Sequence, residues 1–140
     1  MKYPVLRVVL VVLLAVLLTS CGGRLPDSSL VEKAIALQFS QTQIELAQQL
    51  GVPAAAQPSF NLDSVKIDSR QPLRINGLKG YRVEGSYTLK LTYPDRTLVQ
   101  RRNPFEVYLQ RQVEGKTWRL ARLQLASEEN GDEWVTQLIR

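Results

Sequence analysis

The pattern of apolar and polar residues divides the chain into three segments with different periods. Residues 8–18 are an unbroken apolar run, and residues 30–50 repeat apolar side chains at the 3.6-residue spacing of a helix. From residue 60 onward apolar and polar residues alternate, as they do on a half-buried strand. The pattern therefore predicts an apolar N-terminal segment, one amphipathic helix and then an antiparallel sheet.

The predicted helix begins near residue 28 and ends before Gly51, which suits the left-handed position after a helix. Ser29 and Glu32 have the spacing of a capping box, with Asp27 and Ser28 as alternative caps. Residues 39–42 are weak helix formers, so a kink or a break there is an alternative to one continuous helix. The expected apolar face consists of Leu30, Val31, Ala34, Ile35, Leu37, Ile44, Leu46, Ala47 and Leu50.

Residues 81–93 are the clearest predicted strand, because apolar side chains alternate with polar ones along most of their length. Gly85 interrupts the apolar face, which indicates a bulge or a bend. An earlier strand is expected around Leu62 to Ile67, and Asn76-Gly77 predicts the two-residue turn that precedes the clearest strand.

Three shorter strands are expected after residue 96. Pro104 is expected to interrupt the first of them, and the apolar positions change parity after Leu120, which predicts a bulge near Ala121 and Arg122. Asn130-Gly131 predicts a further hairpin turn. Residues 134–139 then form a last strand, with a short terminal helix as the alternative.

This order of elements predicts an α+β domain over residues 28–140, in which the amphipathic helix packs on a curved antiparallel meander of four to five strands. The arrangement resembles the cystatin-like fold and the fold of nuclear transport factor 2. The resemblance concerns the fold alone and implies no activity.

Residues 1–20 have the three parts of a secretory signal: basic residues Lys2 and Arg7, the apolar run, and the small residues Thr19 and Ser20. The apolar run is shorter than the roughly 20 residues that span a membrane. The only cysteine of the chain, Cys21, follows directly. An ordinary signal peptide containing a cysteine and a transmembrane anchor are the alternatives.

Leu18-Thr19-Ser20-Cys21 resembles the lipobox of bacterial lipoproteins. The resemblance implies cleavage between Ser20 and Cys21 by a type II signal peptidase, and diacylglyceryl and acyl modification of Cys21. Residues 21–27 would then be a lipidated tether, and the domain would be membrane-anchored on the extracytoplasmic side of the cell envelope. The segments 105–109 and 118–121 also resemble small lipoproteins of cyanobacteria.

The chain contains no histidine, which excludes Ser-His-Asp and Cys-His catalysis and metal sites built on imidazole. It has neither a phosphate-binding loop nor a nucleophile elbow. The acidic residues around Asn130-Gly131 lack the order of an EF-hand loop and are expected to be solvated. We therefore expect a protein that is not an enzyme and needs no cofactor or metal.

The formal net charge is +5, and the positive charge is concentrated in residues 70–122, which hold twelve Lys and Arg against four Asp and Glu. These basic side chains predict a cationic surface for an anionic lipid, an envelope polymer or an acidic protein, whereas nucleic acid is not expected outside the cytoplasm. Protection of strand edges from aggregation is the alternative role. The candidate surface residues are Arg82, Lys90, Arg101, Arg102, Arg111 and Arg119.

The function expected from the sequence is a non-enzymatic binding or assembly module anchored in the cell envelope. The alternative is a carrier of a small apolar ligand, held in a cavity between the helix and the sheet. The aromatic residues that would line such a cavity are Tyr81, Tyr87, Tyr93, Phe105 and Trp118.

Overall fold

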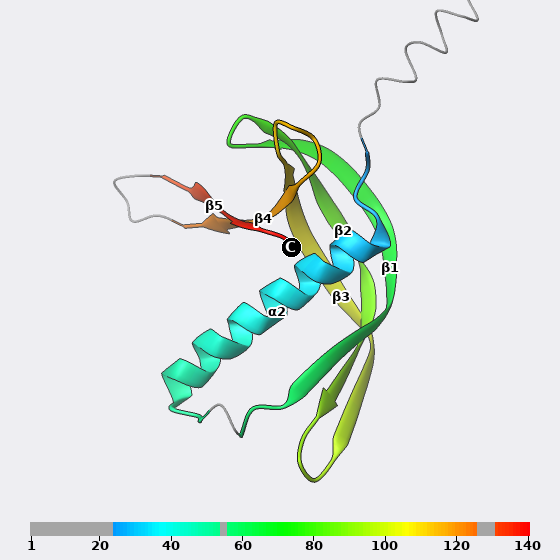
Figure 1. Ribbon diagram of the computed structural model, residues 1–140, viewed down its shortest axis with the longest axis vertical. Coiled ribbons are helices and arrows are strands. Elements are labelled where there is room, and N and C mark those ends of the chain that lie inside the picture. Colours follow the sequence, from blue (N-terminus) through cyan, green and yellow to red (C-terminus); the bar gives the residue numbers. More distant parts are fainter. Residues whose placement is uncertain (1–23, 54–55, 126–130) are drawn as a thin grey trace, which may run out of the picture.

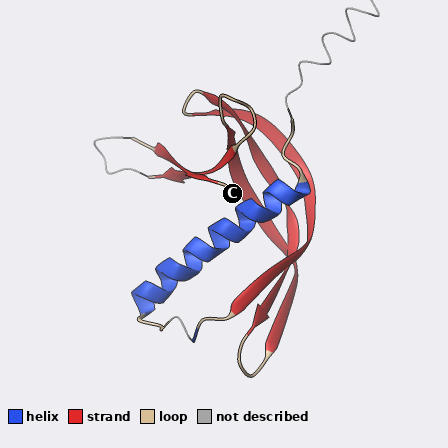
Figure 2. Ribbon diagram, viewed as in Figure 1, coloured by secondary structure: helices blue, strands red, loops and turns tan. Residues whose placement is uncertain are grey.

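A computed structural model describes residues 24–53, 56–125 and 131–140. It confirms the α+β class: one helix packs on an open antiparallel sheet of five strands (Figures 1 and 2). The helix lies across the concave side of the sheet. The elements are α2 (Ser28–Leu50), β1 (Ser59–Ile75), β2 (Leu78–Thr92), β3 (Thr97–Arg111), β4 (Trp118–Gln124) and β5 (Glu133–Leu138).

The strands follow one another in the sheet in chain order, as in a meander. Asn76 and Gly77 both have positive φ, +50° and +78°, which is the backbone of the predicted two-residue hairpin turn. Residues 133–138 form the predicted strand rather than a terminal helix, paired with β4. The turn predicted at Asn130-Gly131 lies partly outside the described residues.

The sheet bends sharply halfway along β2, because each neighbouring strand carries extra residues there. β1 has register shifts after Asp63 and after Ile67, and β3 has one opposite Tyr87 and Leu89. Gly85 is required at this bend: a side chain there would collide with the carbonyl oxygen of Lys66 and the ring of Phe105. The predicted bend at Gly85 is confirmed, but the extra residues belong to the partner strands.

Helix α2 is continuous, so the alternative of a kink or a break at residues 39–42 is wrong. Among the proposed caps it is Asp27 that accepts a hydrogen bond, from the backbone N–H of Leu30 at 2.9 Å. Gly51 ends the helix with φ of +65°, as expected. Within this segment the Thr42 hydroxyl donates a hydrogen bond to the backbone carbonyl oxygen of Gln38 at 3.0 Å, and the helix runs through it unbroken.

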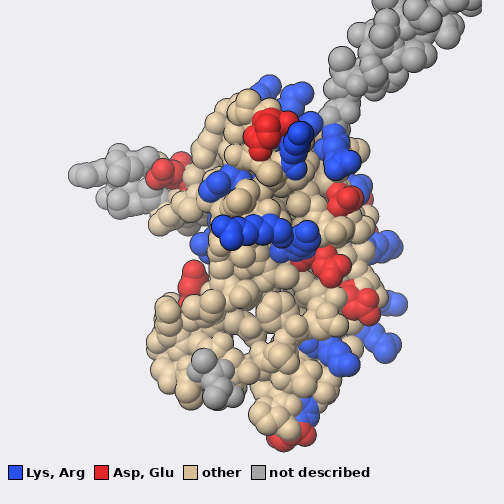
Figure 3. Space-filling model, in the orientation of Figure 1, with Lys and Arg blue, Asp and Glu red and all other residues tan. Residues whose placement is uncertain are grey.

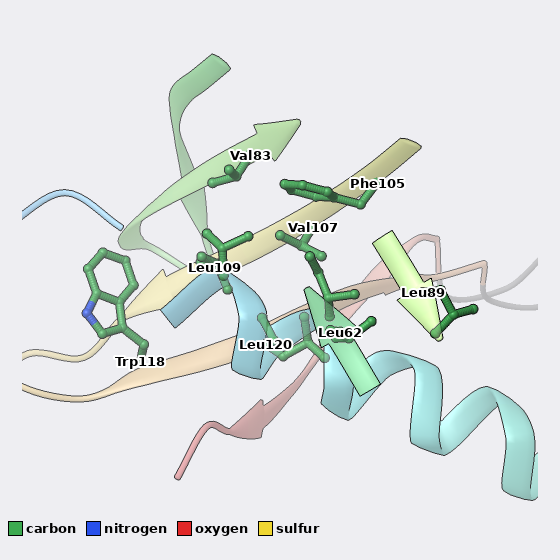
Figure 4. Packing of buried hydrophobic residues seen from close by; sticks show 11 residues of the cluster. Leu62, Val83, Leu89, Phe105, Val107, Leu109, Trp118 and Leu120 are labelled. Carbon is green, nitrogen blue, oxygen red and sulfur yellow. The ribbon is translucent and has the colours of Figure 1, made fainter. Parts of the chain in front are cut away.

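The core lies between the N-terminal half of α2 and the middle of β1 to β4 (Figure 4). Leu62, Val83, Val107, Leu109 and Leu120 all point to this face, and each is buried. The C-terminal half of α2 does not join the core, since Ile44, Leu46 and Leu50 are 50%, 52% and 66% exposed. The predicted apolar face of the helix is therefore confirmed for its first half. In the second half it is confirmed for Ala47, which is buried, and wrong for Ile44, Leu46 and Leu50.

Two expectations for β3 and β4 are also wrong. Pro104 does not interrupt β3, because β4 pairs only with residues 108–111, and a proline that lacks an N–H is tolerated on an unpaired edge. β4 contains no bulge at Ala121 and Arg122, and its register with β5 is regular. The apolar positions of β4 change from one face to the other after Leu120 without a bulge. Beyond Ala121 β4 no longer pairs with β3, and Leu123 lies on the outer face, where it is partly exposed.

Candidate functional site

The basic residues predicted as one surface lie in three places. Lys90, Arg101 and Arg102 lie on the outer face of the sheet, which is turned away from the helix. Arg101 and Arg102 occupy the bulge of β3, where both stand opposite Thr88. Lys66 of β1 lies beside Ser86 on the same face. We call Lys66, Lys90, Arg101 and Arg102 the outer strip.

The bulge is what directs the two arginines of the outer strip. Arg102 has a φ of +56°, a left-handed backbone that costs a non-glycine residue roughly 1 kcal/mol. The side-chain amide of Asn103 bridges the bulge by donating to the carbonyl oxygen of Gln100 at 3.4 Å. Lys and Arg side chains project along the side of the molecule that β1 to β3 form (Figure 3). Within the described ranges no carboxylate lies at ion-pair distance from the outer strip, although Asp63 shares its face.

Arg82 lies on the same face but is neutralised by its neighbours. Its guanidinium contacts Glu84 at 2.6 Å and Glu106 at 3.1 Å. Tyr108 donates a hydrogen bond to Glu106 at 2.5 Å, and its ring packs on Trp134 of β5. The hydrogen bonds from Tyr108 and Arg82 lower the pKa of Glu106, and the bond to Glu106 raises the pKa of Tyr108. Arg82 is therefore part of an intramolecular polar cluster on the outer face of the sheet.

Arg119 and Arg111 are also outside the outer strip. Arg119 donates to the hydroxyl and the carbonyl oxygen of Thr136 at 2.9 and 3.1 Å, which ties β4 to β5. Arg111 pairs with Trp118 on the opposite, inner side of the sheet and is half-buried. Of the six predicted residues, the structure brings together Lys90, Arg101 and Arg102.

Three further basic residues, Lys66, Arg74 and Lys79, were not among the predicted surface residues. Arg74 and Lys79 are paired across the Asn76-Gly77 turn, a register that a two-residue turn imposes on its flanking residues. Turn geometry could therefore have found this pair. No signal in the sequence could have found Lys66, because its place depends on the extra residue in β1.

The aromatic residues predicted to line one cavity are also divided. Tyr87 and Phe105 line a hollow of about 230 Å³ between α2 and the sheet, together with Ile35 and Phe39. Burial raises the pKa of the Tyr87 hydroxyl. Tyr81 packs against Trp118, with ring centroids 6.1 Å apart, and Tyr93 lies under Arg96 at the β2–β3 turn.

The predicted cleavage and lipidation positions, Ser20 and Cys21, lie outside the described residues. Within residues 24–53, 56–125 and 131–140, no group of three or more acidic side chains is placed to hold a metal ion. A search of the same ranges for a helix with the length and apolar character to cross a membrane finds none.

Comparison with known proteins adds no further assignment. No protein-family model matches the chain, and neither a curated protein nor a solved structure is significantly similar to it.

Proposed function

We propose that this protein is a lipid-anchored, non-enzymatic binding module of a bacterial cell envelope, which binds an acidic protein through the outer strip. Cleavage before Cys21 and lipidation of its thiol hold the domain at the membrane on the extracytoplasmic side. The single observation that carries the binding role is the exposure of Lys66, Lys90, Arg101 and Arg102 on one face without ion pairs in the described ranges.

The unfavourable backbone conformation in the bulge of β3 supports this proposal. A left-handed backbone at Arg102 is unfavourable, and such strain persists where the surrounding structure holds it and a function uses it. The result is two adjacent guanidinium groups opposite one small residue, Thr88. Guanidinium groups pair with two carboxylate oxygens at once, which suits acidic side chains of a partner.

The outer strip also borders the part of β3 that β4 leaves unpaired. Basic residues, a bulge and Pro104 on such an edge discourage strand-to-strand aggregation. Shielding the edge and binding a partner are separable roles. Shielding needs a charge of either sign, whereas binding an acidic partner needs a positive charge.

The test is affinity capture of the lipidated protein after mild solubilisation of membranes. We expect Arg101→Glu with Arg102→Glu to lose the acidic partner, and capture by the unmodified protein to fall with ionic strength. The matched control is Lys33→Glu with Arg140→Glu, which makes the same charge change on exposed residues of α2 and the C-terminus. Equal recovery by both double variants would show that the outer strip only shields the edge.

A second candidate function is transport of a small apolar ligand. It is favoured by one observation, the hollow between α2 and the sheet in which Phe39, Tyr87 and Phe105 meet. A volume of about 230 Å³ suits a ligand smaller than most drugs. Phe39→Trp should then report ligand binding by a change of fluorescence. A signal that does not respond to alkyl or aromatic probes would remove this candidate.

We also propose that the domain belongs to a known group of folds. A helix across the concave face of a bent antiparallel meander supports assignment to the cystatin-like or nuclear transport factor 2-like group of folds. An experimental structure with a significant match to either group would establish it.

A further inference from the structure

One end of the molecule gathers three segments that are distant in the sequence. They are the start of the described chain at residues 24–27, the β1–β2 turn and the β3–β4 turn. Arg24 and Lys116 line the same hollow beside Trp118, and Arg74 and Lys79 line another hollow with Arg111. Pro26 is buried here, and its carbonyl oxygen accepts a hydrogen bond from Arg70 Nε at 2.7 Å.

This end, which we call the basic end, is strongly positive. Its two carboxylates are both engaged locally: Asp27 caps α2, and Glu114 accepts a hydrogen bond from Thr117, which lowers the pKa of Glu114. Figure 3 shows basic side chains clustered where the chain leaves toward its N-terminus. With these two carboxylates, six basic residues give the basic end a net charge of +4. The six are Arg24, Arg70, Arg74, Lys79, Arg111 and Lys116.

The hollow between the two turns is built to receive a negative group. Its volume is about 360 Å³, and three cationic side chains and one carboxylate, that of Glu114, line it. The Arg111 guanidinium lies against Gly115, with Nη2 2.8 Å from the position that a Cβ would take. Arg111 Nε is buried, and no acceptor within the described residues bonds to it. Guanidinium and ammonium groups are the donors that bind phosphate oxygens, and the three cationic side chains supply both kinds at this hollow.

The basic end lies close in the chain to the predicted lipid anchor, so the anions nearest to it are the headgroups of the membrane. Three peptide units separate Cys21 from Arg24, and three fully extended units span at most about 11 Å. That length is close to the Debye length of about 8–10 Å at physiological salt. A lipidated Cys21 therefore holds the basic end within electrostatic reach of the bilayer surface.

The geometry points to a membrane-docking face: we propose that the basic end lies on anionic phospholipid headgroups, with a lipid phosphate in the hollow lined by Arg74, Lys79 and Arg111. This inference rests on the lipid anchor in the proposed function. Stable membrane attachment commonly combines an acyl anchor with a basic patch. The docked orientation also leaves the outer strip free, because Lys90 is twelve residues, about 40 Å of strand, from the β1–β2 turn.

The test uses the full lipidated protein in vesicles of phosphatidylcholine alone or with phosphatidylglycerol. A fluorophore is attached at Val113→Cys in the β3–β4 turn, or at Asp95→Cys in the opposite β2–β3 turn, and a quencher is attached to lipid headgroups. We expect the Val113→Cys label to be quenched several-fold more in the anionic vesicles. The Asp95→Cys label should be quenched equally in both.

Charge reversal then assigns the effect to residues. Arg74→Glu with Lys79→Glu and Lys116→Glu should abolish the extra quenching at Val113→Cys. The matched control, Lys66→Glu with Lys90→Glu and Arg101→Glu, makes the same charge change on the outer strip and should retain it. Equal quenching in the two kinds of vesicle, or loss with both triple variants, would overturn the inference.

The anchor is checked separately by the intact mass of the purified protein. A mass without lipid on Cys21 would contradict the proposed function itself. A lipidated protein whose Val113→Cys label does not respond to anionic lipid would leave the anchor in place and refute only the docking face.

Discussion

The two halves of helix α2 have the same apolar period but different surroundings. In the first half Val31, Ala34 and Ile35 are buried against the sheet, and Ile35 is 4% exposed. In the second half Ile44 continues the apolar face at helical spacing, yet it is 50% exposed. The helix is straight and unbroken across both halves, so the difference originates in the sheet.

The sheet diverges from α2 at the point where burial is lost. β4 leaves β3 beyond Ala121, and bulges bend β1 and β3 on either side of Gly85. A helix of 23 residues is about 35 Å long, which exceeds the width of the sheet that remains beneath it. The helical period thus identifies the apolar face of a helix. How much of that face is buried depends on the sheet, which other parts of the chain form.

The largest expected effect comes from the same substitution in the two halves. Ile35→Ala should lower the free energy of unfolding by about 3 kcal/mol, because it leaves a cavity in the core. Ile44→Ala removes a half-exposed side chain and should cost less than about 1 kcal/mol. Urea unfolding of both variants measures the difference. Equal losses would mean that the second half of α2 is covered as well as the first.

A smaller effect is expected at the bend that separates the halves. Gly85→Ala forces a Cβ against the Lys66 carbonyl and the Phe105 ring, and it should cost about 2–3 kcal/mol. Gly131→Ala is the matched control: it meets open space but has a φ of +64°, so only the roughly 1 kcal/mol of a left-handed backbone applies. If Gly85→Ala unfolds at the same urea concentration as the unmodified protein, the bend does not depend on Gly85.

The smallest effect concerns the polar cluster that Arg82, Glu84, Glu106 and Tyr108 form on the outer face of the sheet. Because Tyr108 and Arg82 lower the pKa of Glu106, its contribution to stability is present above the ordinary glutamate pKa. That contribution is lost as the pH falls through the lowered pKa. Between about pH 6 and pH 3, Glu106→Gln should therefore lose less stability than the unmodified protein.

The control for this experiment is Glu32→Gln, an exposed glutamate of α2 with no hydrogen bond or ion pair to another described side chain. Its urea midpoint should follow the unmodified protein across the same pH range. A parallel response of Glu106→Gln and the unmodified protein would show that the cluster contributes nothing to acid stability.

The residues that end a helix or form a tight turn were predicted well from the sequence. Gly51 ends α2, and Asn76-Gly77 forms a two-residue turn, because both depend on left-handed backbone conformations that only a few residues adopt. Pro104 misled the prediction. Whether a proline interrupts a strand depends on whether its missing N–H faces a neighbouring strand, and the pairing of β4 with residues 108–111 does not extend to Pro104.

The candidate surface was less predictable than the fold. Alternation along β2 places Arg82 and Lys90 on one face, and both do lie there. It cannot show that Arg82 is held by Glu84 and Glu106, since Glu106 comes from another strand. Nor can it show that Arg74, Lys79 and Arg111 surround one hollow, which requires two separate turns to meet.

The amino-acid sequence determined the order of elements, the helix ends, the hairpin turn at Asn76-Gly77 and the segregation of positive charge. Each of these depends on residues within a few positions of one another. Tertiary structure alone decided how much of α2 is buried, which arginines form ion pairs, and that the start of the described domain coincides with a basic end. These properties depend on register and on the bend of the sheet, because contacts between distant strands carry no trace in local periodicity.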